Sequence, residues 1–242
     1  GQMTACLLAI ILFRKTSRIK VSLKNFKPNA QIIKNIYSIA IPSGVMTSLP
    51  SILVALLNSL LATVSQTAIA FFGIYFKLQS FIYMPANGLI QGMRPLISYN
   101  YGARHFDRVK KIIKVSIIST AVILCCGTII FMGLPELVLS WFNATEQLLE
   151  IGIIGLRVIS PCFILSTMGV VISGVFESLG KGRQSLTISL LRQFIITLPL
   201  AYILLKVIGL NGIWLSFVIA EGIASVIAVI LIKKELHNFK VD

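Results

Sequence analysis

Six long apolar segments constrain the fold of this chain more than any other feature of its sequence. The hydrocarbon core of a bilayer is about 30 Å thick, and an α-helix needs about 20 apolar residues to cross it. A segment in lipid must also satisfy its own backbone hydrogen bonds, as a helix does. The composition agrees, because 56% of the residues are hydrophobic and only 12% are charged, too few to cover a soluble domain. The sequence therefore predicts an all-α membrane protein with six complete transmembrane helices, over Ile36–Val64, Ala68–Met93, Ile112–Leu134, Ile151–Phe176, Leu186–Leu205 and Gly212–Ile232.

A shorter apolar stretch, Met3 to Phe13, precedes these segments and runs directly into Arg14 and Lys15. It is too short to span a bilayer, and its charge follows the apolar part instead of preceding it as in a signal peptide. We therefore expect residues 1–13 to be the end of a truncated transmembrane helix, 14–35 a basic cytoplasmic linker, 36–232 a six-helix membrane unit and 233–242 a cytoplasmic tail. Prolines should interrupt the spans at Pro42, Pro50, Pro85, Pro161 and Pro199.

The basic residues occur in alternate connections, which predicts the orientation of the chain. Lys and Arg are concentrated in residues 14–34, 94–114, 181–192 and 233–240, while the connections at 65–67, 135–150 and 206–211 hold almost none. By the positive-inside rule, the basic connections and the C-terminus are cytoplasmic. The net charge of +14 is thus spread over several loops. No single basic domain with stacking aromatic residues is indicated, so we expect no nucleic-acid partner.

Charged residues at membrane depth are the main candidates for function, because an unpaired charge there is costly. Glu221 is the only acid near the middle of a predicted span, and its candidate partners are Lys77, Arg157 and Arg192. A structural ion pair and a proton- or cation-coupling site both fit Glu221. Arg192 lies near a helix end, where it could also extend to the interface.

Lys77 lies about 15 Å into its span, where it either serves function or only extends toward the interface. Its helix face also carries Met84, Gly88 and Gln91, at spacings of three or four residues. Asn58, in the preceding span, lies at a similar depth and could form an interhelical hydrogen bond or contact a substrate or ion. We hypothesise that Lys77 and Glu221 face the interior of the unit and share one polar network, directly or through Asn58.

The remaining motifs argue against catalysis. The cysteines have no CxxC spacing, and the two histidines, His105 and His237, have no acidic or cysteine neighbours at metal-ligand spacing. The sequence contains neither a complete phosphate-binding loop nor a Gly-x-Ser-x-Gly motif. We therefore expect no enzyme activity, no metal and no cofactor.

One stretch of the chain also carries a family resemblance. It reads Gly73-Ile74-Tyr75-Phe76-Lys77-Leu78-Gln79-Ser80-Phe81, then Met84-Pro85, Gly88, Gln91-Gly92, Pro95-Leu96-Ile97 and Tyr99-Asn100-Tyr101-Gly102-Ala103-Arg104. This pattern resembles the eighth helix and following loop of bacterial multidrug and toxic compound extrusion (MATE) transporters. Residues 178–182 with Arg192 beyond them, and residues 214–217 leading to Glu221, agree with it.

The resemblance implies a twelve-helix transporter with two six-helix lobes in the bacterial inner membrane, of which this chain would be the C-terminal lobe. Such transporters exchange Na⁺ or H⁺ for cationic or amphipathic compounds by alternating access. The expected partners are therefore membrane lipid, the N-terminal lobe and a small, cationic substrate. Combined with the charge analysis, a substrate or ion pathway is expected at Lys77, Glu221, Asn58, Gln79, Gln91 and Arg157, and structural or gating roles at Pro42, Pro85, Asn100, Gly102 and Arg192.

Two other functions remain open from the sequence. A related flippase for lipid-linked oligosaccharides has the same two-lobe architecture, and Lys77 and Arg157 would suit its phosphate-bearing substrate. A membrane scaffold without transport activity would use Lys77 and Glu221 only for structure.

Overall fold

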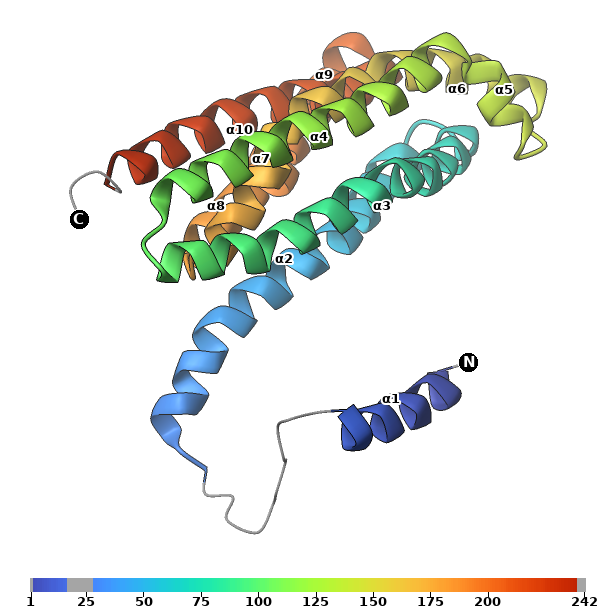
Figure 1. Ribbon diagram of the computed structural model, residues 1–242. Helices are drawn as coiled ribbons and strands as arrows, with labels where there is room; N and C mark the ends of the chain where they lie inside the picture. The colour runs from blue at the N-terminus through green and yellow to red at the C-terminus, as the bar shows by residue number, and fades with distance from the viewer. Residues whose placement is uncertain (1, 17–27, 239–242) are drawn as a thin grey trace. The chain divides into compact units, whose positions relative to one another are not determined.

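The computed structural model describes residues 2–16 and 28–238 and divides into two units, residues 1–37 and 38–242 (Figure 1). The first unit contains α1 (Gln2–Thr16) and the first residues of α2. Most of the predicted linker, residues 17–27, lies outside the described residues. The helix α1 extends three residues past the predicted end at Phe13, and its described side chains are exposed.

The second unit is a helical bundle. Its elements are α2 (Ala30–Ala62, which begins in the first unit), α3 (Gln66–Gly102), α4 (Phe106–Gly133), α5 (Pro135–Ser140), α6 (Glu146–Ile159), α7 (Pro161–Ser178), α8 (Gly182–Leu190), the π-helical turn η1 (Leu191–Ile195), α9 (Thr197–Ile208) and α10 (Leu210–Asn238). Among the described residues, six spans are long and apolar enough to cross a membrane: 30–62, 66–102, 106–133, 161–178, 182–208 and 210–237. The predicted all-α fold with six complete transmembrane helices is confirmed.

The prolines act differently from the prediction that all of them interrupt helices. The helix α2 continues through Pro42 and Pro50, and α3 continues through Pro85. Of these five prolines, only Pro161 begins a new helix, so the predicted span Ile151–Phe176 is divided between α6 and α7. Pro199 lies in the first turn of α9, where its missing N–H has no helical partner to lose.

The fifth predicted span is divided by a π-helical turn that no sequence pattern indicated. It separates α8 from α9, and the Thr197 hydroxyl donates a hydrogen bond to the Arg192 carbonyl across it. A π turn widens the helix locally and is frequent at functional sites. The last predicted boundary also moves, because α10 continues to Asn238, through most of the expected tail.

Two helices end in turns that require a left-handed residue. Gly180 has φ 73°, and the Lys181 amide donates to the Phe176 carbonyl at 2.8 Å, which closes α7 with a Schellman-type turn. The same turn closes α3, where the His105 amide donates to the Asn100 carbonyl at 2.8 Å. The left-handed residue there is Arg104, with φ 58°, although a side chain disfavours that conformation.

The apolar core of the second unit consists of two clusters at different levels of the bundle. The first contains the large rings of Phe71, Phe72, Tyr75, Phe163 and Trp214. The second contains Ile90, Ile97, Val171 and Phe176. Along α7 and α10, polar side chains lie between the two levels, and this polar level holds the candidate site.

Neighbouring helices pack closely at small residues. In Figure 1, α3 and α4 run side by side, and α7 packs against both α4 and α10. A Cβ atom at Gly155 of α6 would lie 2.4 Å from the Phe71 ring, and one at Gly174 of α7 would lie 2.6 Å from Ile90. The small residues therefore allow the close helix packing expected of membrane bundles.

Candidate functional site

A polar cleft of about 740 Å³ opens in the second unit, lined by α2, α3, α7, α8, η1, α9 and α10. Small-molecule sites typically occupy about 300–1,000 Å³. Its hydrogen-bonding side chains without a formal charge are Ser43, Thr47, Gln79, Ser80, Tyr83, Asn87, Gln91, Ser173, Ser189, Gln193 and Thr197. The cleft can therefore take a small ligand with both polar and apolar groups.

The helix α3 contributes one continuous face to the cleft. Ser80, Met84, Asn87, Gln91 and Arg94 all line it, at spacings of three or four residues that place them on one side of the helix. The opposite side of α3 is apolar and buried in the two core clusters. Because polar residues recur at the helical period on one side of α3 and apolar residues on the other, the polar side faces the cleft.

An ion pair between Arg192 of η1 and Glu221 of α10 forms part of the cleft wall. Arg192 Nε lies 3.1 Å from Glu221 Oε1, and the two side chains are only 16% and 12% exposed. Gly169 of α7 makes room for the arginine, because a Cβ atom there would lie 3.3 Å from Arg192 Cδ. Of the three partners expected for Glu221, the structure therefore selects Arg192.

The Arg192–Glu221 pair leaves part of its bonding capacity unused. Despite the short distance, the Arg192 Nε–H makes no hydrogen bond within the described part of the chain. Glu221 Oε2 and Gln193 Oε1 are also buried without a hydrogen-bond partner there, and both residues line the cleft. Buried oxygens without partners are costly unless a proton, a cation or water satisfies them.

A second ion pair, which the sequence did not indicate, forms another part of the cleft wall. Arg94 of α3 lies 2.8 Å from Glu177 of α7, and the Ser185 hydroxyl donates to the same carboxylate at 3.1 Å. Arg94 belongs to the basic range 94–114, which the charge pattern assigned to a connection between spans. Helical spacing from the other cleft-lining residues places Arg94 and Glu177 on the cleft-lining faces of α3 and α7. This spacing was the sequence signal that could have identified them.

The aromatic and hydroxyl residues near the cleft form hydrogen bonds between helices. The Tyr83 hydroxyl lies 2.6 Å from the Ser166 hydroxyl, which connects α3 to α7. The Ser225 hydroxyl of α10 donates to the Leu165 carbonyl of α7. These contacts fix the relative rotation of the three helices that position Glu221 and the polar face of α3.

Lys77 does not lie where it was expected. Its side chain is exposed and lines no part of the cleft, although it lies one turn before Ser80 on the same side of α3. It has no ion pair among the described residues. Among the described residues, Arg192 and not Lys77 lies beside the Glu221 carboxylate, so a network that joins Lys77 to Glu221 stays a prediction.

The other predicted pathway residues divide into two groups. Gln79 and Gln91 line the cleft. Asn58 is half-buried away from the cleft, with its Oδ1 unpaired among the described residues, and Arg157 is exposed on α6. The sequence placed these residues at membrane depth but could not specify which way their helices were rotated.

The predicted structural residues have local roles. Asn100 is buried at the end of α3, where its Nδ2 donates to the Leu96 carbonyl at 2.8 Å. Gly102 is helical, with open space where a Cβ would be, so the left-handed residue of this turn is Arg104. Pro42 lies next to Gly182 of α8, and Pro85 is exposed within α3.

The fold and cleft define a polytopic helical membrane protein with a polar site inside the bundle. The chain belongs to the MatE family, which matches residues 42–203. The multidrug export protein MepA of Staphylococcus aureus (strain N315) is 31% identical over 243 residues, which cover 100% of this chain and 53% of that protein. The MepA protein of Staphylococcus haemolyticus is 31% identical over 240 residues. The chain thus spans about half the length of these relatives.

Solved structures agree with the fold. One is described as the outward-facing conformation of a multidrug resistance MATE family transporter of the MOP superfamily, with a TM-score of 0.90 and 21% identity over 99% of this chain and 55% of the other. A MOP superfamily transporter from Pyrococcus furiosus has a TM-score of 0.89 and 22% identity, over 98% of this chain and 55% of the other. These structures share the fold, and the family match together with the MepA relatives confirms the predicted family.

Proposed function

We propose that this chain is the C-terminal lobe of a secondary active multidrug efflux antiporter, which exports cationic or amphipathic compounds in exchange for Na⁺ or H⁺ by alternating access. The observation that carries the proposal is the cleft with Glu221 at its wall, where one carboxylate oxygen is paired with Arg192 and the other lacks a partner. The similarity of this chain to multidrug export proteins supports the assignment to multidrug efflux.

The exchanged cation would bind where the unpaired oxygens lie. A proton needs only Glu221 Oε2, whereas Na⁺, a hard cation with oxygen ligands, would take Gln193 Oε1 as well. Binding of the cation would weaken the attraction between Glu221 and Arg192, since the negative charge of the carboxylate would then be shared with the bound cation. Arg192 lies in the π turn, so this change would act on the junction between α8 and α9.

Transport by the full-length protein in liposomes tests the proposal. We expect efflux of a fluorescent cation driven by a Na⁺ or a pH gradient, and loss of ion-driven efflux in Glu221→Gln. Glu177→Gln is the matched control, because it neutralises a carboxylate in the same cleft whose two oxygens already have partners, one in the Arg94 ion pair and one in the Ser185 hydrogen bond. Gln193→Leu should reduce Na⁺-driven efflux and leave H⁺-driven efflux. Wild-type coupling in Glu221→Gln would refute the assignment.

The proposal requires a second lobe, since alternating access opens and closes a cavity between two halves. We therefore expect residues 1–242 alone not to transport, and co-expression of the preceding half to restore efflux. Ion-coupled efflux by residues 1–242 alone would contradict the two-lobe assignment.

A flippase for lipid-linked oligosaccharides is the second candidate, favoured by the exposed Lys77 beside the cleft face of α3. A lysine there suits a diphosphate-bearing lipid better than a cationic compound. Lys77→Gln distinguishes the two, since it should impair flipping of a fluorescent diphosphate lipid but not efflux of a cation. A scaffold without transport would show neither activity.

A further inference from the structure

The outer side of α4 carries basic residues at one end and apolar residues beyond them, in a single stripe. Arg108, Lys111, Val115, Ile118 and Val122 follow one another at three- or four-residue spacing and are all exposed. The opposite side of α4 is buried through Val109, Ile113, Ser116, Thr120 and Leu124. The helix thus presents one continuous face away from the core.

Arg104 extends the basic end of this stripe. It lies four residues before Arg108, in the turn that closes α3, and adopts a left-handed φ of 58°. Left-handed backbone is unfavourable for a residue with a side chain, and a glycine would avoid that cost. Arginine at this position therefore points to a role for its guanidinium group.

The three basic residues are free to bind an anion. Arg104, Arg108 and Lys111 are exposed and form no ion pair within residues 28–238. The acid on α4, Asp107, flanks the stripe and lies 3.4 Å from Lys110, which also lies outside the stripe. No cleft-lining residue among those described belongs to α4, so the stripe is separate from the candidate transport site.

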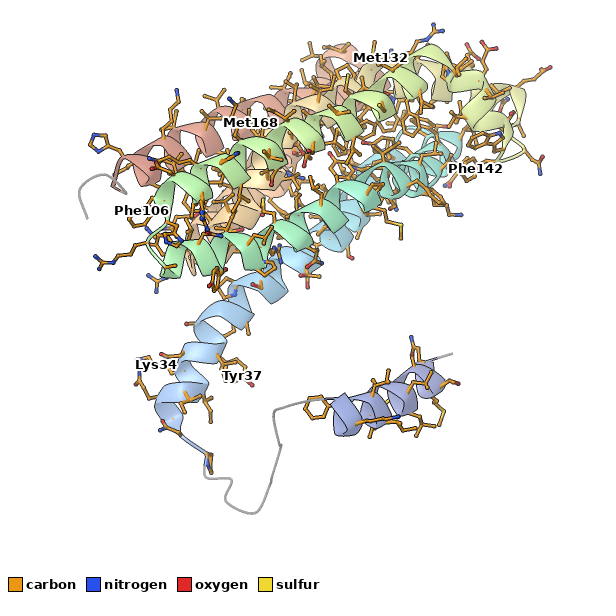
Figure 2. The ribbon with its side chains drawn as sticks, in the orientation of Figure 1. Lys34, Tyr37, Phe106, Met132, Phe142 and Met168 are labelled. Atoms are coloured by element: carbon orange, nitrogen blue, oxygen red, sulfur yellow. The ribbon has the colours of Figure 1, made fainter. Side chains whose placement is uncertain are left out.

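The length of the stripe fits one phospholipid. The apolar part of the stripe begins at Val115, directly after Lys114, and the eight residues from Val115 to Val122 span about 12 Å, somewhat less than half the hydrocarbon thickness. Figure 2 shows Phe106 and Met132 at opposite ends of α4, so the helix continues well past this depth. A lipid phosphate at the basic end would place its acyl chains along the apolar part.

We propose that this surface, the α4 stripe formed by Arg104, Arg108, Lys111, Val115, Ile118 and Val122, binds an anionic phospholipid. Arg108 and Lys111 hold the phosphate, and Arg104 contacts the headgroup from the preceding turn. Arginine binds phosphate through two parallel N–H bonds, and lysine adds a point charge. The apolar residues select a lipid over a free phosphate ion.

Thermal unfolding of the full-length protein in detergent, with added phosphatidylglycerol or phosphatidylcholine of the same acyl chains, tests this proposal. Phosphatidylglycerol should stabilise the wild type at lower concentration than phosphatidylcholine. The double variant Arg108→Gln/Lys111→Gln should weaken apparent phosphatidylglycerol affinity about thirty-fold, which corresponds to about 1 kcal/mol for each basic residue near a membrane surface. Arg104→Gly should weaken it about five-fold.

The control variant Lys110→Gln/Lys206→Gln removes the same charge, from a position of α4 outside the stripe and from α9. It should keep wild-type lipid dependence. Equal losses in both double variants would show a diffuse charge effect and overturn the proposal. Equal stabilisation by the two lipids would also overturn it. So would an equal rise in unfolding temperature with inorganic phosphate alone and with phosphatidylglycerol. Unfolding temperatures in phosphatidylcholine identify any variant that fails to fold.

Discussion

The buried pair of Arg192 and Glu221 provides the sharpest test of the site. At 3.1 Å and an effective dielectric constant of about 20, two unit charges attract by about 5 kcal/mol. Desolvation offsets part of this, but removal of one partner leaves the other uncompensated, at a cost of about 3–5 kcal/mol in buried pairs. We expect Glu221→Gln to lower the free energy of unfolding by about 3 kcal/mol. This is the lower end of that range, because the cleft lets water reach Arg192.

Substitution of the other partner, Arg192, should lower the free energy of unfolding by less. Arg192→Gln leaves a carboxyl group, which can take up a proton and lose its charge. We therefore expect a cost of about 1–2 kcal/mol, and a coupling energy of about 2–3 kcal/mol from the double variant. The assay is a double-mutant cycle on the full-length protein, with the free energy of unfolding measured by denaturing titration from mixed micelles.

Lys77→Gln supplies the control for this cycle. Because Lys77 is exposed and away from the pair, its effect should add to that of Glu221→Gln within about 0.5 kcal/mol. A coupling between Arg192 and Glu221 below about 0.5 kcal/mol would refute the reasoning. An equally large coupling between Lys77 and Glu221 would also refute it, since the carboxylate would then belong to another network.

Three further outcomes are expected. Gly155→Ala should lower stability by about 1–3 kcal/mol, because its Cβ would lie 2.4 Å from a buried phenylalanine ring; the control Gly73→Ala, with open space at the Cβ position, should be neutral or stabilising in the same unfolding assay. Equal effects would contradict the close packing of α6. Arg104→Gly should raise the free energy of unfolding in lipid-free detergent by about 1 kcal/mol, since it relieves a left-handed backbone, and a decrease would argue against this. In a protein without other cysteines, an impermeant thiol reagent should label Thr145→Cys but not His105→Cys in intact cells, and the opposite pattern would reverse the predicted orientation.

Much of the architecture was predictable because a bilayer restricts what a sequence can form. Length and apolar composition alone required helices, and the six expected spans overlap the six in the structure. The motif around Lys77, Gln79 and Gln91 indicated the family before any contact was known. The charge at Glu221 likewise marked a polar level at membrane depth, which lies between the two apolar clusters.

The ends and interruptions of helices were less predictable. Proline predicts a break only where neighbouring helices cannot absorb its missing hydrogen bond, so Pro161 starts a helix while Pro85 lies inside one. The π turn at Leu191–Ile195 packs against α10, and the Thr197 hydroxyl donates a hydrogen bond to the Arg192 carbonyl across it. The hydrogen bond joins residues only five apart, but the packing against α10 joins segments distant in the chain and leaves no sequence pattern.

The sequence alone determined which residues lie at membrane depth and which side of each helix is polar, because those properties depend on a single helix and its solvent. Only the tertiary structure decided that Arg192, and not Lys77 or Arg157, pairs with Glu221, and that Arg94 and Glu177 meet across the cleft. The physical reason is that helical periodicity reports angles about one axis, whereas an ion pair requires the relative rotation and depth of two helices. Packing of side chains far apart in the chain, such as Gly169 against Arg192, sets both.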